Sequence, residues 1–140
     1  MSRSLARELA FKALFQLEFN NGEGEFKDFY EELAIDTVIS NGKKIKQTES
    51  LYVKQVVKET RARLKEIDEI ISAHLKKSWT IQRLATVDRN VLRLSIYEIK
   101  FAENEIPKGI IINEAVEIAK KYGTDDSGRF VNGILAAIAN

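Results

Sequence analysis

Residues 86–101, TVDRNVLRLSIYEIKF, restrict the possible folds of this chain more than any other stretch. When successive residues are placed about 100° apart, as in an α-helix, apolar side chains cover almost the whole circumference. These side chains are Val87, Val91, Leu92, Leu94, Ile96, Tyr97 and Ile99. Only the strip of Arg89, Arg93 and Lys100 is consistently basic, which suits a protein partner or an internal ion pair. A helix that is apolar nearly all round belongs in the centre of a bundle, so the rest of the chain must supply helices around it.

The rest of the sequence also favours helices, because 140 residues contain one proline and seven glycines. We therefore expect an all-α protein. Apolar spacing and turn residues predict helices at about 4–19, 26–39, 49–77 and 86–101, one after Pro107 that stops at Gly123, and a last one opening at 124–127. Residues 81–84 are expected to form a short turn or helix. The long segment 49–77 is expected to break near 66–68. Ser4 and Thr86 are expected to cap the helices that follow them.

Several classes of protein are excluded by composition. The absence of cysteine rules out disulfides and thiolate metal ligands, and favours a reducing cytoplasm. With His74 as the single histidine, His-based metal sites and Ser-His-Asp triads are implausible. The amphipathic N-terminus is unlike a secretory signal, and no apolar run approaches the roughly 20 residues of a membrane span.

Charge is segregated along the chain although the net charge is only +1. Residues 23–36 carry six acids and one lysine, residues 43–65 eight bases and two acids, and residues 76–100 six bases and two acids. Such charged blocks are most often solvated helix faces, and less often a surface that binds nucleic acid. Both interpretations apply, in this order, to the strip of Lys54, Lys58, Arg61 and Lys65. The modest total charge argues against a strong nucleic-acid binder acting alone.

Three phenylalanines, Phe11, Phe15 and Phe19, recur every fourth residue in the first helix, flanked by Arg7 and Lys12. Aromatic rings among basic side chains could stack on the bases of single-stranded RNA, although an aromatic stripe at helical spacing more often belongs to the core.

Glu98 projects onto an apolar side of the central helix, so its carboxylate needs an arginine or a helix N-terminus as partner.

One ordered series of motifs resembles the NusB family of bacterial transcription antitermination factors. The likeness is dense over residues 79–135, thinner over the first helix and weak over 20–75. The motifs that carry it are Ala6-Arg7-Glu8, Ala13-Leu14-Phe15, Trp79 with Arg83-Leu84, Val87-Asp88-Arg89-Asn90-Val91-Leu92-Arg93-Leu94, Ile96-Tyr97-Glu98, Ile106-Pro107, Ile112-Asn113-Glu114-Ala115-Val116-Glu117-Ile118-Ala119-Lys120, Tyr122-Gly123 and Phe130-Val131-Asn132-Gly133-Ile134-Leu135.

The resemblance implies a compact bundle of about seven helices in two lobes, about 1–77 and about 78–140, within one RNA-binding domain. It implies binding to the boxA element of ribosomal RNA leader transcripts together with the ribosomal protein NusE. The complex would load onto RNA polymerase and suppress premature termination. No enzyme activity, cofactor or metal is implied, the protein would be cytoplasmic, and a homodimer is possible.

The family pattern also implies functional residues. Those expected to face RNA are Arg3, Arg7, Phe15, Asp126, Arg129 and Phe130, with Lys76, Lys77 and Gln82 on a looser local match. The expected NusE surface includes Arg83, Asp88, Arg89 and Glu114. Phe15 stands where the family often has tyrosine, so stacking survives without a hydroxyl hydrogen bond. The N-terminus also has fewer arginines than the family can show.

Three alternatives differ from this interpretation. The chain could be a stand-alone relative of the NusB-like domain fused to an RNA cytosine methyltransferase, because no catalytic cysteine or methyl-donor domain is present. It could be a helical scaffold or homodimer that binds only protein through its small-residue helix face. A small enzyme is the least supported, because no phosphate loop, metal spacing or nucleophile-base pair occurs.

Overall fold

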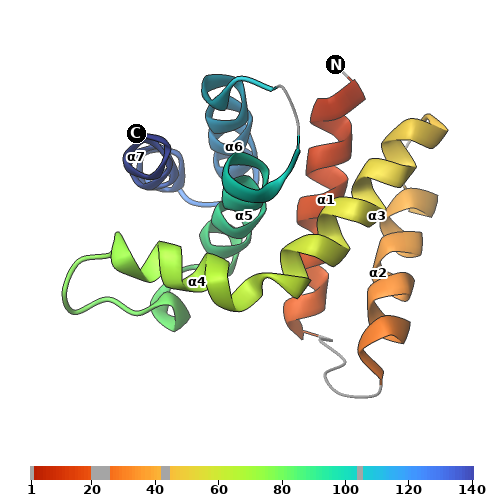
Figure 1. Ribbon diagram of the computed structural model, residues 1–140, viewed down its shortest axis with the longest axis horizontal. Coiled ribbons are helices and arrows are strands. Elements are labelled where there is room, and N and C mark those ends of the chain that lie inside the picture. The colour runs from red at the N-terminus through yellow and green to blue at the C-terminus, as the bar shows by residue number, and fades with distance from the viewer. Residues whose placement is uncertain (1, 20–25, 42–44, 104–105) are drawn as a thin grey trace. The chain divides into compact units, whose positions relative to one another are not determined.

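The computed structural model describes residues 2–19, 26–41, 45–103 and 106–140, and the side chains of these residues from Ser4 onward. This part of the chain forms seven α-helices and no strand, which confirms the all-α prediction. The chain divides into two units, Met1–Arg61 and Ala62–Asn140. Figure 1 shows the helices of each unit.

The first unit is built from α1 (Ser2–Phe19), α2 (Lys27–Asn41) and α3 (Gln47–Ala62). Helix α1 packs against α2, and its small residues Ala6, Ala10 and Ala13 are fully buried. Helix α3 is tied to α2 by two ion pairs, Arg61 with Glu31 at 2.7 Å and Lys58 with Glu32. Because the Arg61–Glu31 pair is largely buried, it contributes more than the exposed Lys58–Glu32 pair.

The second unit surrounds helix α5 (Thr86–Ile96) with α4 (Leu64–Ala73), α6 (Lys108–Tyr122) and α7 (Ser127–Ala139), as Figure 1 shows. The α5 residues Val91, Leu92, Leu94 and Ile96 are buried on different sides of the helix. The prediction of a central helix is therefore confirmed. Arg93 pairs with Asp68 of α4 through two hydrogen bonds of 2.8 Å, the internal ion pair that the sequence left as one option.

The end of the central helix differs from the prediction. Instead of a continuous α-helix to Phe101, residues Tyr97–Phe101 form a π-helical turn, closed by the N–H of Ala102 donating to the carbonyl of Tyr97 at 2.9 Å. A π-turn adds a residue to the helical turn and so changes which side chains face the core. Tyr97 and Glu98 are both buried there, and the predicted burial of Glu98 is confirmed.

The predicted helix at 49–77 is two helices that meet at Arg63, not near 66–68. Helix α4 lies in the second unit, which begins at Ala62, and Asp68 of α4 binds Arg93 of α5 there. The expected lobe boundary near residue 77 stays a prediction. The predicted short turn or helix at 81–84 is a 3₁₀ turn, η2 (Ile81–Arg83).

Two predicted caps are wrong. Helix α1 already includes Ser2, and α5 begins at Thr86 with Ala85 at the cap position and no side-chain hydrogen bond. The predicted stop at Gly123 is confirmed, since Gly123 is the C-cap of α6. A Cβ at Gly123 would lie 2.4 Å from Ser127 Oγ and 2.7 Å from the carbonyl oxygen of Ala119, so close approach demands glycine here.

We expect Gly123→Ala to lower the free energy of unfolding by about 1–3 kcal/mol, because the added methyl group must displace the turn before α7. Gly109→Ala is the matched control. A Cβ at Gly109 meets nothing within 4 Å, so alanine in that helix should be neutral or stabilising by up to about 1 kcal/mol. Urea unfolding of both variants checks this, and equal losses would contradict the crowding at Gly123.

Candidate functional site

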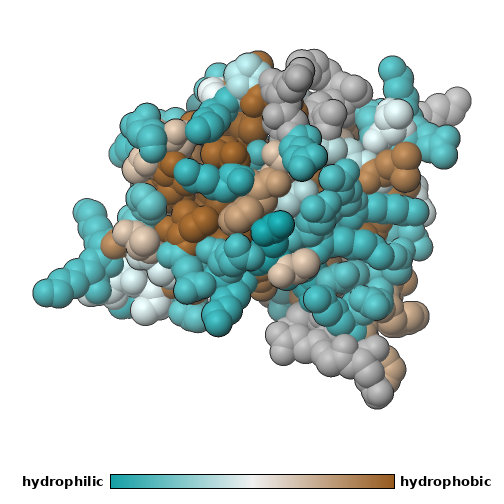
Figure 2. Space-filling model, in the orientation of Figure 1, coloured by the Kyte–Doolittle hydropathy of each residue, from teal (hydrophilic) through white to brown (hydrophobic). Residues whose placement is uncertain are grey.

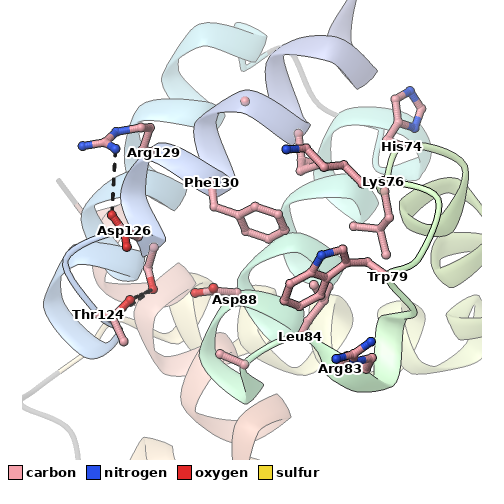
Figure 3. Close-up of a pocket in the computed structure, with 15 residues that line it drawn as sticks. His74, Lys76, Trp79, Arg83, Leu84, Asp88, Thr124, Asp126, Arg129 and Phe130 are labelled. Atoms are coloured by element: carbon pink, nitrogen blue, oxygen red, sulfur yellow. Dashed lines mark hydrogen bonds and ion pairs between the residues drawn. The ribbon is translucent and has the colours of Figure 1, made fainter.

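A pocket of about 810 Å³ opens in the second unit beside the central helix. It lies among the end of α4, the segment around η2, the start of α5 and the first turns of α7 (Figure 3). The lining residues are His74, Leu75, Lys76, Trp79, Arg83, Leu84, Ala85, Asp88, Thr124, Asp126, Ser127, Arg129, Phe130, Gly133 and Ile134. Figure 2 shows apolar surface exposed over the region of α5, α6 and α7, with hydrophilic surface around it.

The wall formed by residues 79–84 is fixed by an arginine of the central helix. The Arg89 Nη1 donates hydrogen bonds to the carbonyl oxygens of Ile81 at 3.1 Å and Leu84 at 2.8 Å. Ile81 and Leu84 are themselves buried. Arg89 therefore holds η2 against α5, which positions Trp79 and Arg83 beside the pocket.

Trp79 presents a large aromatic surface at this wall, with 48% of the residue exposed. The Arg83 guanidinium lies over its ring, 5.3 Å from the ring centre, and donates to the carbonyl oxygen of Ser78 at 3.4 Å. Phe130 of α7 points toward Trp79 from the opposite side of the pocket (Figure 3). Two aromatic rings thus line one apolar cavity.

The start of α7 forms the other wall. The Ser127 Oγ accepts a hydrogen bond of 3.0 Å from the N–H of Thr124, which shapes the turn before the helix. Asp126 and Arg129 form an i, i+3 ion pair at 3.8 Å, with both side chains 87% exposed. Because both side chains are exposed, the pair contributes little to stability. For the same reason, both charged groups are accessible to a ligand.

Asp88 supplies an acidic group to the pocket. Its Oδ1 atom is buried and accepts no hydrogen bond within the described part of the chain. Lys76, Arg83 and Arg129 are exposed cations around the same pocket. An apolar aromatic cavity with basic side chains around it can hold a flat ring that carries a phosphate.

The structure brings together four of the residues predicted to bind RNA. Lys76, Asp126, Arg129 and Phe130 all line this pocket. Lys77 is exposed beside Lys76, whereas Gln82 lines a separate cleft with Lys65, Asp68 and Glu69. The role of these residues in RNA binding stays a prediction.

The predicted RNA-binding residues of the first unit are less accessible. The Arg7 side chain is only 2% exposed, which favours a structural role over a phosphate contact. Phe15 is half-buried, with its ring 6.0 Å from buried Phe11 and 5.2 Å from exposed Phe19. The Arg3 side chain lies outside the described residues.

The residues predicted for NusE do not form one separate surface. Arg83 and Asp88 line the pocket together with the predicted RNA residues, and Arg89 binds backbone carbonyls behind it. Glu114 is half-buried on α6.

Trp79 lines the pocket but was not among the predicted site residues. The sequence held a signal for it, because Trp79 is an aromatic residue in a turn between the basic residues Lys77 and Arg83.

Among the described residues, no helix is both long and apolar enough to cross a membrane. The same residues contain no group of three or more histidine, aspartate or glutamate side chains placed to hold a metal ion.

A helical bundle with an aromatic pocket and exposed cations around it has the features of a nucleic-acid-binding protein of the all-α class. The NusB family model matches residues 4–140 of this chain. The transcription antitermination protein NusB of Bdellovibrio bacteriovorus is 42% identical over 136 residues, which cover 96% of this chain and 92% of that protein. This chain therefore belongs to the NusB family.

Solved structures agree with this assignment. A NusB structure from T. maritima is 42% identical with a TM-score of 0.83, covering 98% of this chain and 89% of that one. A chain from a crystal structure of the antitermination factors NusB and NusE in complex with double-stranded RNA is 32% identical with a TM-score of 0.81, covering 99% and 96%.

We expect Arg89→Ala to lower the free energy of unfolding by about 1–3 kcal/mol, since the carbonyl groups of Ile81 and Leu84 lose a charged donor. Arg83→Ala is the control, because Arg83 is exposed and its hydrogen bond is long; it should cost less than about 0.5 kcal/mol. Thermal unfolding of the two variants measures the difference. A larger loss for Arg83→Ala would contradict the positioning role of Arg89.

Proposed function

We propose that this protein is a non-catalytic adaptor of transcription antitermination. It binds the boxA element of ribosomal RNA leader transcripts together with NusE and delivers the RNA to RNA polymerase in the cytoplasm. Membership of the NusB family supports this, and so does the related chain of known structure, which is in a complex with NusE and RNA.

The pocket of the second unit carries the proposal. Lys76 and Arg129 contact the phosphates and set the position of the RNA, while the rings of Trp79 and Phe130 take up unstacked bases. Phosphate contacts carry no sequence information directly, so selection of boxA falls to the base contacts. Single-stranded RNA suits this division, because its bases can leave the stack and pack on aromatic side chains.

NusE is needed for useful affinity because this chain has a net charge of only +1. Affinity for RNA rises with the number of phosphates neutralised, and a partner with further cations adds to that number. We place NusE on the second unit, on the exposed side of α6 that carries Asn113 and Glu117 beside half-buried Glu114. This leaves the pocket open to RNA.

We expect the double variant Lys76→Ala/Arg129→Ala to bind boxA RNA more weakly in the presence of NusE. The slope of log affinity against log salt should fall by about 0.7 for each phosphate that the variant no longer neutralises. Filter binding over a range of salt concentrations gives both quantities, and circular dichroism checks that helical content is unchanged.

Lys54→Ala is the matched control, because Lys54 is an exposed lysine of α3 in the first unit. Its salt slope should equal that of the unmodified protein. An unchanged slope for the double variant together with a reduced slope for Lys54→Ala would contradict the pocket as the RNA site. It would indicate that RNA binds the basic strip of α3 instead.

A further inference from the structure

We propose that the exposed face of helix α2 is a docking surface for an amphipathic helix of another protein, whose apolar stripe is bordered by lysine or arginine. This surface lies in the first unit and uses none of the residues assigned above to RNA or to NusE. The proposal is therefore independent of the proposed function.

A line of exposed apolar side chains along α2 is the first observation. Phe26, immediately before the helix, Phe29 and Leu33 are 56%, 62% and 47% exposed. When residues are placed about 100° apart, these three side chains fall on one line, which we call the α2 ridge. The ridge lies opposite the side of α2 that faces the core, which consists of the buried residues Glu31, Ala34, Ile35 and Val38.

The α2 ridge differs from the scattered apolar surface of an ordinary soluble protein. A helix that packs against a core on one side normally carries polar side chains on the opposite side. Single exposed apolar residues need no explanation, but a contiguous group of large ones marks an interaction site. Figure 2 shows apolar patches over α2 among the hydrophilic surface.

A row of acidic side chains runs along one border of the α2 ridge. Asp28, Glu32 and Asp36 follow one another at intervals of four residues, so they share one side of the helix. Lys58 of α3 forms an ion pair with Glu32 in the middle of the row, and Lys54 lies near the same carboxylate. Asp28 and Asp36, at the two ends of the row, are exposed. Because eight residues separate them, they lie about 12 Å apart along the helix.

These acids decide which class of macromolecule can cover the α2 ridge. Carboxylates beside it repel the phosphates of RNA and of anionic lipid, so the apolar contact must come with cations. A protein helix that docks through an apolar stripe offers anchors at i, i+3 or i+4, and i+7, which is the spacing of the ridge itself. Lysine or arginine near both ends of that stripe would reach Asp28 and Asp36.

A second copy of this chain fits the α2 ridge less well. If two copies of α2 pack antiparallel across a two-fold axis, the rotation places both acid rows on the same side, where like charges repel. Helix α3 of a second copy would bring lysines. However, Leu51 is the only large apolar side chain that is exposed on α3, all of whose residues the structure describes. A helix of a different protein is therefore the occupant we propose.

The test uses two synthetic helical peptides of about 18 residues, long enough to span the α2 ridge. Both carry one stripe of leucine at helical spacing, which lysine borders in one peptide and glutamate in the other. We expect the unmodified protein to bind the lysine peptide about tenfold more tightly than the glutamate peptide, because opposite charges at the rim attract and like charges repel. Fluorescence anisotropy of the labelled peptides measures both dissociation constants.

The variant Phe29→Gln/Leu33→Gln removes most of the α2 ridge. Both side chains are exposed and glutamine is a good helix former, so thermal unfolding should stay unchanged. Binding of the lysine peptide should weaken at least about tenfold, because two apolar contacts are lost. Leu51→Gln is the matched control, because Leu51 is an exposed leucine of α3 outside the ridge. It should bind the lysine peptide as the unmodified protein does.

The variant Asp28→Lys/Asp36→Lys reverses the charge at both ends of the acid row. We expect it to prefer the glutamate peptide, because the rim charges now match that peptide. Asp125→Lys is the matched control, since Asp125 is an exposed acid of the second unit. It should keep the preference for lysine.

Four results would overturn the docking surface. The unmodified protein could bind neither peptide, or the glutamine variant could bind the lysine peptide at full affinity. The charge-reversed variant could keep the preference for lysine, which would show that the acid row is not read. Finally, the glutamine variant could abolish self-association in sedimentation, or weaken binding of boxA RNA with NusE, which would assign the α2 ridge to a second copy or to RNA.

Discussion

The second unit depends on the burial of α5 among α4, α6 and α7. Leu92, Leu94 and Ile96 are each at most 2% exposed, and truncating such a side chain typically costs about 2–5 kcal/mol. Because the helix is covered by apolar packing nearly all round, its polar side chains can serve only a few purposes. Arg93 forms a part-buried ion pair, Arg89 holds η2, and Asp88 lines the pocket. The core and the site are therefore built from the same eleven-residue helix.

The pocket itself is made from segments that lack regular core packing. The 3₁₀ turn η2 and the turn at Thr124–Ser127 leave a gap next to α5, into which Trp79 and Phe130 project from opposite sides. Hydrogen bonds from Arg89 and to the Ser127 hydroxyl hold both turns in place. A preorganised aromatic pocket of this kind loses little conformational entropy on binding, which suits an adaptor of nearly neutral charge.

The fold could be predicted well from the sequence because a helix that buries one face must carry apolar residues at helical spacing. The central helix, the stop at Gly123 and the burial of Glu98 followed from it. The break at Arg63 and the π-turn at Tyr97 did not, because neither segment contains the glycine or proline that would mark it in the sequence. Sequence also could not show that Arg7 is buried, since helical projection gives a residue's direction but not what covers it.

The central claim is that RNA enters the pocket beside Trp79, and the single tryptophan of this chain offers a direct measurement. Tryptophan fluorescence is followed as boxA RNA is added to the protein with NusE, and the same titration with a Trp79→Phe variant is subtracted. A base packed on the indole ring should quench the emission with the same midpoint as binding measured by gel shift. Full RNA binding without any change in Trp79 emission would contradict the account.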